Sequence, residues 1–412
     1  MHAQNHVAIA SIAAAIAVFS SPAVAVDVTA KSFNPDLSLT LQGLYKKAKT
    51  ESGEEITGFW PAGHAHAADE REKNRGFLLG ESELTLSANV DQYFKGLATL
   101  AHSDEHGTEV EEAWFQTLAL GNGFTIRGGR FLSGIGYMNE QHPHAWDFSD
   151  PTLMQRALFG EHGYSQDGVQ VKWLAPTDTF IEFGVEIGRG DRFPGTEINT
   201  SGRNSSAVFA HIGGDIGDNH AWRVGASHLA SKAIDRDADI TDISGAEVET
   251  PFTGKSRTTM IDAVYKWSIE PGRSLKLQFE AFRRKETGRL ACDDADPLAP
   301  SLCTGGLTDT FASTQSGGYL QAVYQFAKAW RAGVRVDRLD SGTISFGPAL
   351  AGALPAVDYS PKRSSVMVDW SPSEFSRLRL QFAKDEAQQG LTDNQLTLQY
   401  IMTLGAHGAH KF

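Results

Sequence analysis

The chain has 412 residues, a formal net charge of −13 and a mean hydropathy of −0.28, and its basic residues form no cluster. An acidic chain of this kind argues against nucleic-acid binding. The low mean hydropathy does not exclude a membrane protein, because a strand of a membrane β-barrel exposes only alternate residues to lipid.

The N-terminal stretch is typical of a secretory signal peptide. Residues 7–19 form an apolar run, and Ala23-Val24-Ala25 follows as a small-x-small cleavage pattern, although no lysine or arginine precedes the run. The run is too short to cross a bilayer as a helix. We predict a signal peptide over residues 1–25 and a mature domain over residues 26–412, which contains no apolar run long enough for a membrane helix.

The mature chain is predicted to form sixteen strands, each with an apolar row and a polar row. Leu37, Leu39 and Leu41 begin this alternation in the first strand. Successive side chains of a strand point to opposite faces, so the apolar row can face lipid. The seven connections after even-numbered strands are short, as at Gly121-Asn122-Gly123, and the eight others are generally longer and polar. Outer-membrane barrels have this division into periplasmic turns and extracellular loops.

Aromatic residues lie beside the short connections. Amphipathic rings at this height form the interfacial girdle of a membrane barrel. The tryptophans concerned are Trp173, Trp222, Trp267, Trp330 and Trp370.

The last strand resembles the closing strand of bacterial outer-membrane β-barrels. Its apolar row is regular, and counting by twos from Leu396 reaches the C-terminal Phe412. Residues 405–410 depart from this pattern, because they are small and polar where such strands usually stay apolar. The alternative interpretation is an edge strand of a soluble β-domain. The apolar row comprises Leu396, Leu398, Tyr400, Met402 and Leu404.

Over its whole mature length the layout resembles sixteen-stranded bacterial porins, including the phosphate-selective type. Residues 134–148 and 405–412 are also similar to uncharacterised proteobacterial outer-membrane proteins linked to zinc supply. The resemblance implies an all-β fold, namely a single transmembrane antiparallel up-and-down barrel in the bacterial outer membrane, with a third loop folded inward. It further implies contact with outer-membrane lipid and lipopolysaccharide, and a homotrimer as in typical porins.

The function implied is passive diffusion of small hydrophilic solutes or ions through a porin-like channel. A barrel of sixteen strands is wide enough to leave an aqueous lumen. Two alternatives stay open: a structural or adhesive barrel without an open pore, and a lipid-modifying barrel enzyme. Ser133-Gly134-Ile135-Gly136 only faintly suggests a nucleophile turn, and no histidine partners it. We therefore expect no enzymatic activity and no cofactor.

The long third loop, predicted over residues 133–165, carries the candidate metal ligands His142, His144, Glu140 and Asp147. Imidazole and carboxylate groups suit Zn²⁺, so one interpretation is a transient divalent-metal site that gives the pore a weak zinc preference. The other interpretation is a purely structural constriction with hydrogen-bonded histidines. Other predicted outward loops add His64, His66, His102 and His106 beside acidic residues.

Charged residues are expected to line the lumen, since the apolar rows are assigned to lipid. Rings of charge set ion preference in pores, but a mutually neutralising wall is the alternative interpretation. The sequence leaves the choice between cations and anions open. The predicted pore-lining residues are Lys172, Arg223, Lys266, Arg331, Arg335, Arg379, Glu182, Asp262 and Asp337.

Cys292 and Cys303 are the two cysteines, close together in a loop-like stretch rich in Asp, Pro and Gly. In an oxidising compartment this spacing predicts a disulfide bond that pins one loop. A metal-binding or catalytic thiol pair is the alternative.

Overall fold

The structure is a computed structural model that describes residues 35–49, 55–59, 75–103, 107–160, 163–196, 201–296, 298 and 300–405. The predicted signal peptide, residues 1–25, lies outside these residues, as do His64, His66, His106 and Phe412. No helix among the described residues has the length and apolar character needed to cross a membrane.

The described residues form one antiparallel sheet of nineteen strands and two short helices. The strands are β1 Asp36–Lys47, β2 Gly76–Leu79, β3 Ser82–Asn89, β4 Phe94–Ser103, β5 Gly107–Thr117, β6 Phe124–Leu132, β7 Ser165–Leu174, β8 Phe180–Gly188, β9 Ser205–Ile216, β10 His220–Arg236, β11 Asp239–Thr241, β12 Glu247–Glu249, β13 Phe252–Glu270, β14 Arg273–Asp294, β15 Leu307–Ala327, β16 Trp330–Phe346, β17 Lys362–Ser373, β18 Ser376–Glu386 and β19 Asp393–Gly405. The helices are the 3-10 helix η2 Pro143–Ala145 and α2 Leu153–Phe159.

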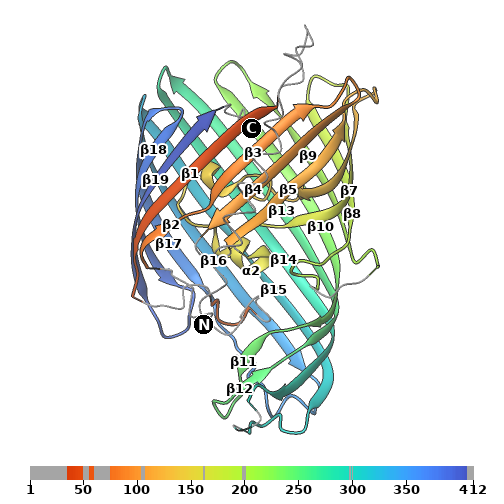
Figure 1. The fold of residues 1–412 in the computed structure, drawn as a ribbon. Coiled ribbons are helices and arrows are strands. Elements are labelled where there is room, and N and C mark those ends of the chain that lie inside the picture. Colours follow the sequence, from red (N-terminus) through yellow and green to blue (C-terminus); the bar gives the residue numbers. More distant parts are fainter. Residues whose placement is uncertain are drawn as a thin grey trace, which may run out of the picture. The chain divides into compact units, whose positions relative to one another are not determined.

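The sheet closes into a barrel of sixteen strands (Figure 1). Strands β2 and β3 both pair with β1 and act as one interrupted strand, and β11 and β12 form a small hairpin beyond the barrel wall. Closure comes from β1 and β19, which pair from Ser38↔Gly405 to Lys47↔Leu396. The predicted strand number and up-and-down topology are confirmed.

The strands are inverted relative to a water-soluble protein: apolar side chains point outward and polar side chains inward. On β16, Val334 is 54% exposed whereas the neighbouring Arg335 is 2% exposed. The predicted apolar row of the last strand follows the same rule, since Leu396, Leu398 and Tyr400 are all exposed. A band of exposed apolar residues around a closed barrel is the surface that lipid requires.

Strand ends are placed well where turn residues mark them. The alternation in the sequence predicts a fifth strand over residues 124–132, which coincides with β6. Residues 121–123 before it all have positive φ, as the turn prediction requires. The sequence also predicts a fourth strand over residues 110–120, which begins and ends too late, because β5 covers Gly107–Thr117.

The barrel wall is uneven in height, because β13, β14 and β15 extend well beyond their neighbours (Figure 1). The β11–β12 hairpin pairs with the end of β14 in this extension. A separate apolar cluster fills it, with Phe252, Leu290, Phe311 and Leu354 packed around the Cys292–Cys303 disulfide bond. The two Cα atoms are 5.5 Å apart.

Candidate functional site: the third loop inside the barrel

The third loop connects β6 to β7, and two glutamates of the barrel wall bind its first residues inside the lumen. Glu186 on β8 accepts hydrogen bonds from the Ser133 hydroxyl (2.6 Å) and the Gly134 N–H (2.9 Å). Glu280 on β14 accepts from the N–H groups of Tyr137 (3.0 Å) and Met138 (2.9 Å). Inward carboxylates thus satisfy backbone donors that the loop would otherwise bury without partners.

The entry is tightly packed, not flexible as the glycines alone suggest. A Cβ atom on Gly134 would lie 2.4 Å from the ring of Phe209. Gly136 has φ +69°, and a Cβ there would lie 2.4 Å from a carboxylate oxygen of Glu280. Only glycine fits both positions without displacing a neighbour.

Apolar side chains fix the loop to the inner wall. Thr152 caps helix α2 by accepting a hydrogen bond from the Gln155 N–H (3.0 Å). The helix lies against β15 and β16 within the largest buried cluster of the barrel. Loop members of this cluster are Ile135, Met138, Trp146, Leu153, Met154, Ala157, Leu158, Phe159 and Tyr164.

The middle of the loop brings two acidic residues to a basic wall. Asp147 contacts Lys276 on β14 and Arg331 on β16, each at 2.9 Å. Asp150 contacts Arg335 on β16 and Arg363 on β17, each at 2.8 Å. Burial favours the neutral acid, but the facing cations outweigh it and hold the pKa of both aspartates below the usual range.

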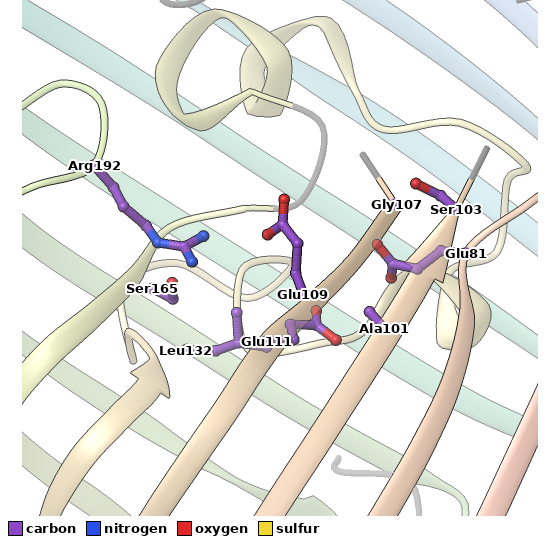
Figure 2. Close-up of a pocket in the computed structure, with 9 residues that line it drawn as sticks. All are labelled: Glu81, Ala101, Ser103, Gly107, Glu109, Glu111, Leu132, Ser165 and Arg192. Carbon is purple, nitrogen blue, oxygen red and sulfur yellow. The ribbon is translucent and has the colours of Figure 1, made fainter. Parts of the chain in front are cut away.

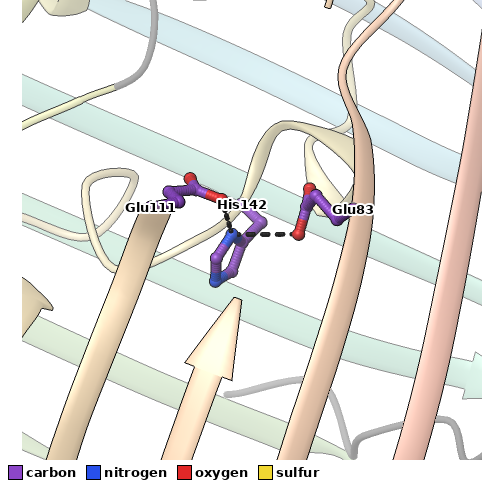
Figure 3. Close-up of side chains that lie close together, drawn as sticks. All are labelled: Glu83, Glu111 and His142. Carbon is purple, nitrogen blue, oxygen red and sulfur yellow. Dashed lines mark hydrogen bonds and ion pairs between the residues drawn. The ribbon is translucent and has the colours of Figure 1, made fainter. Parts of the chain in front are cut away.

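The histidines of the same loop face an acidic wall. His142 Nδ1 lies 3.1 Å from Glu83 and 3.0 Å from Glu111, and Figure 3 shows the ring between these two carboxylates. Its Nε2 lies 3.1 Å from Glu112. The His144 ring stacks on that of His142, with its Nδ1 2.7 Å from Glu83. We call Glu83, Glu111, Glu112, His142 and His144 the acidic clamp.

Both ring nitrogens of His142 have carboxylate partners, which is the arrangement of an imidazolium. Burial opposes the charged form of His142, but Glu111 and Glu83 outweigh it and raise its pKa well above the usual range. The third loop is therefore held at both sides of the lumen by opposite charges.

A small cavity adjoins the acidic clamp on the side of the long loops. Its volume is about 20 Å³, and Figure 2 shows Glu81, Glu109 and Glu111 around it, with Arg192 reaching over from the next long loop. Glu111 lines the cavity and also contacts His142. Its Oε1 is buried and has no hydrogen-bond partner within the described part of the chain. The cavity therefore offers an unused acceptor to a cation or a water molecule.

The structure splits the four predicted metal ligands. His142 and His144 come together at Glu83, but Glu140 lies 3.6 Å from Arg223 and 4.0 Å from Lys172. Asp147 is engaged by Lys276 and Arg331. Carboxylates held by cations are poor metal ligands, and the structure does not bring the four residues together at one place. Glu83, Glu111 and His142 instead place their ligand atoms within 4.8 Å of one another.

Glu111 and Glu112 were missed because they break the alternation of β5. The β4–β5 register shifts between Thr99 and Leu100, which pair with Glu112 and Val110. Glu111 is the extra residue of a β-bulge, so two consecutive glutamates are buried inside the barrel. The paired acidic residues at 111–112 are the sequence signal, but the period-two pattern assigns only one of them inward.

All nine predicted pore-lining residues lie on inward positions of their strands. Their charges are largely matched by partners. Lys172 contacts Glu182 at 2.7 Å, Arg335 contacts Asp337 at 3.0 Å, and Arg223 contacts Asp262 at 3.5 Å. Arg379 donates to the carbonyl of Trp146 in the third loop. His102, the described member of the other predicted histidine clusters, contacts Thr108.

Comparison with known proteins now identifies the family. No model of a protein family matches the chain. An uncharacterized protein of Aquifex aeolicus is 30% identical over 403 residues, which cover 93% of this chain and 81% of that protein. The chain belongs to the family of this Aquifex protein.

The fold of this chain is also similar to those of solved outer-membrane proteins. OmpT, an outer membrane protein of Vibrio cholerae, has a TM-score of 0.54 at 8% identity, covering 92% of this chain and 99% of OmpT. A trimer form of OmpT has a TM-score of 0.50 at 9% identity, covering 91% of this chain and 100% of that chain. The outer membrane channel DcaP of Acinetobacter baumannii has a TM-score of 0.50 at 11% identity, covering 92% of this chain and 100% of DcaP. The likeness shows the fold: the chain is a sixteen-stranded antiparallel barrel like these outer-membrane proteins.

Proposed function

We propose that this porin-type barrel is an outer-membrane channel for the passive diffusion of small hydrophilic solutes, with a preference for cations. The observation that carries the proposal is the uneven match of charges inside the lumen. The third loop brings Asp147 and Asp150 to the basic wall of β14, β16 and β17. On the other side, the wall of β3 and β5 carries Glu83, Glu111 and Glu112. The basic residues of the loop that contact these glutamates are His142 and His144. Excess acidic charge along a pore favours cations.

The test is the reversal potential of the refolded channel in a planar bilayer with a potassium chloride gradient. A cation-preferring channel gives a reversal potential of the cation sign, and Glu111→Gln should move it toward zero. Glu249→Gln, on the β12 strand beyond the barrel wall, is the matched control. A wild-type potential of the anion sign contradicts the cation preference, and the absence of any conductance steps contradicts the channel itself.

The acidic clamp supports a weak divalent-metal preference within the same channel. Glu83, Glu111 and His142 supply two carboxylates and one imidazole, a ligand set suited to Zn²⁺. Tetrahedral ligands at ~2.0–2.1 Å from zinc are roughly 3.4 Å apart, close to the contacts around His142. A site with few protein ligands, completed by water, releases its ion readily enough for permeation.

A barrel with a closed lumen is the second candidate, and the depth to which the third loop is packed favours it. Helix α2 and the buried cluster occupy the space next to β15 and β16. A structural or adhesive barrel would refold with β-rich circular dichroism yet give no conductance steps at any voltage. Single-channel recordings of such a sample separate the two functions.

We propose no catalytic activity. Ser133, the faint nucleophile candidate, is fully buried and donates its hydroxyl to Glu186. Because this hydroxyl is buried and hydrogen-bonded to a carboxylate that anchors the loop, a substrate cannot reach it. Lipid hydrolysis by the purified barrel, lost in Ser133→Ala, would contradict this.

A homotrimer remains part of the proposal, supported by the trimer form described for the Vibrio neighbour. Analytical ultracentrifugation of the detergent-solubilised barrel would show three chains per particle, and a single chain would contradict it.

A further inference from the structure

A basic cleft lies on the outer face of the barrel, where β9, β10 and β13 approach the long loops. It has a volume of about 350 Å³, and its lining includes four basic residues: Arg203, Lys232, Lys255 and Arg257. Lys255 and Arg257 are exposed and alternate with the buried Ser256 and Thr258. They belong to the same outward row as the lipid-facing Ile261, so this cleft is not part of the lumen.

The register of the sheet places like charges directly opposite one another, both within this cleft and between Arg257 in the cleft and Lys285 on the next strand. Lys232 pairs with Lys255 across β10 and β13, and Arg257 pairs with Lys285 across β13 and β14. Like charges directly opposite on neighbouring strands destabilise a sheet. None of the ion pairs between described residues involves Arg203, Lys232, Lys255 or Arg257. In a chain of net charge −13, this local excess of positive charge calls for an anion from outside.

The height of the cleft on the barrel indicates which anion it meets. Trp267 lies beside the periplasmic turn after β13, and Arg257 is ten residues closer to the outer end of the same strand. At ~3.3 Å per residue and a tilt of ~40°, this separation is ~25 Å of membrane height, the height of the apolar band of a barrel. Lys255 and Arg257 therefore lie at the level of the outer headgroups.

We propose that this cleft binds the phosphate groups of an anionic lipid of the outer leaflet. Arg257 and Arg203 can each present a planar fork of donors to phosphate oxygens, and Lys232 and Lys255 supply point charges. The exposed Ser206 hydroxyl adds a neutral donor on the same cleft. Ile187 lines the cleft as well and is exposed, which suits the start of an acyl chain. In a bacterial outer membrane the lipid of this chemistry is the phosphorylated glycolipid of lipopolysaccharide.

The test compares lipid binding by full-length refolded barrels in detergent. The probe is lipid A carrying both phosphate groups, and dephosphorylated lipid A and inorganic phosphate serve as comparison ligands. The variant is Lys255→Gln/Arg257→Gln. The matched control is Arg273→Gln/Lys328→Gln, two exposed residues at the opposite, periplasmic end of the wall. Circular dichroism confirms that all samples have refolded.

We expect the cleft variant to bind phosphorylated lipid A at least tenfold more weakly than wild type, while the control variant binds normally. Wild type should prefer the phosphorylated over the dephosphorylated lipid by a similar factor, a comparison that needs no variant. Equal binding of the two lipids by wild type would overturn the proposal, as would equal binding by wild type and cleft variant. Binding of inorganic phosphate without binding of the lipid would also overturn it.

Discussion

His142 shows how one residue acquires a role from its partners. A lone histidine in a loop titrates near its ordinary pKa, whereas His142 lies among Glu83, Glu111 and Glu112. Its raised pKa means that folding favours the protonated ring. This attraction is fully present below the unfolded value of about 6.5 and is lost as the pH rises through the higher folded pKa. The acidic clamp therefore holds the third loop most firmly below about pH 6.5, as long as its glutamates stay ionised.

The same shift sets the pH range of metal binding, because zinc needs the neutral imidazole. Sequence alone predicts that zinc binding weakens below pH 6.5, but the raised pKa of His142 moves this limit upward. Zinc-dependent block of the conductance should strengthen as the pH rises above neutrality, and His142→Ala/His144→Ala should abolish it at every pH while leaving the open pore. A zinc response that is identical in both channels across the range would limit the loop to a constriction.

Asp147 shows the reverse case, a buried carboxylate that neutralises two partly exposed cations. Asp147→Asn keeps the shape of the side chain but leaves Lys276 and Arg331 without their shared charge. Breaking a fully buried pair costs ~3–5 kcal/mol, and we expect a smaller cost here because both cations are partly exposed and Arg331 keeps Asp369. We expect a lower free energy of unfolding in urea and a reversal potential shifted toward anions. Asp235→Asn, at an exposed outer position, is the control, and equal effects of the two substitutions would contradict this role.

At the scale of elements, the third loop contacts two walls of the barrel with side chains of opposite charge. Its histidines meet the acidic β3 and β5, and its aspartates meet the basic β14, β16 and β17. The basic wall also contains inward acidic side chains, among them Glu280, Asp337 and Asp369. Because the loop adds two aspartates to one wall and two histidines to the other, we expect it to influence the cation preference that we propose for the channel.

The extension of β13 to β15 is a second element with its own small core. Cys292 and Cys303 lie in the centre of that core, next to Leu290 and Phe311. Because the disulfide bond closes a loop with a sequence separation of 11, chain entropy assigns it roughly 3 kcal/mol. Mass spectrometry of the unreduced protein should find both thiols oxidised. In Cys292→Ser/Cys303→Ser we expect faster proteolysis of this extension with unchanged conductance, and reduced wild type should behave like the variant. Free thiols in the unreduced protein would reject the bond.

At the scale of the molecule, sequence predicts what is local and misses what is distant. The alternation around Leu398 and the turn at residues 121–123 are patterns of neighbouring residues. Patterns of this kind predict the number of strands, the facing of their side chains and the up-and-down topology. The contact between Asp147 and Lys276 joins residues 129 positions apart, and no periodicity connects them. The bulge at Glu111 adds a second kind of error, because one extra residue reverses the facing of its neighbours.

The exposed apolar band leads to a prediction about the position of the whole barrel in the membrane. Leu380 lies at the middle of β18 between Val368 and Leu398, and it is 44% exposed. An arginine at the bilayer midplane of a barrel costs ~2–4 kcal/mol, whereas one near the interface costs ~0–1 kcal/mol. Leu380→Arg should therefore lower the stability of the barrel in vesicles by this larger amount. Thr241→Arg, on the exposed β11 beyond the wall, should leave it unchanged. If urea titrations in vesicles give equal midpoints for both variants, Leu380 does not face lipid, and the assignment of the apolar row to the membrane fails.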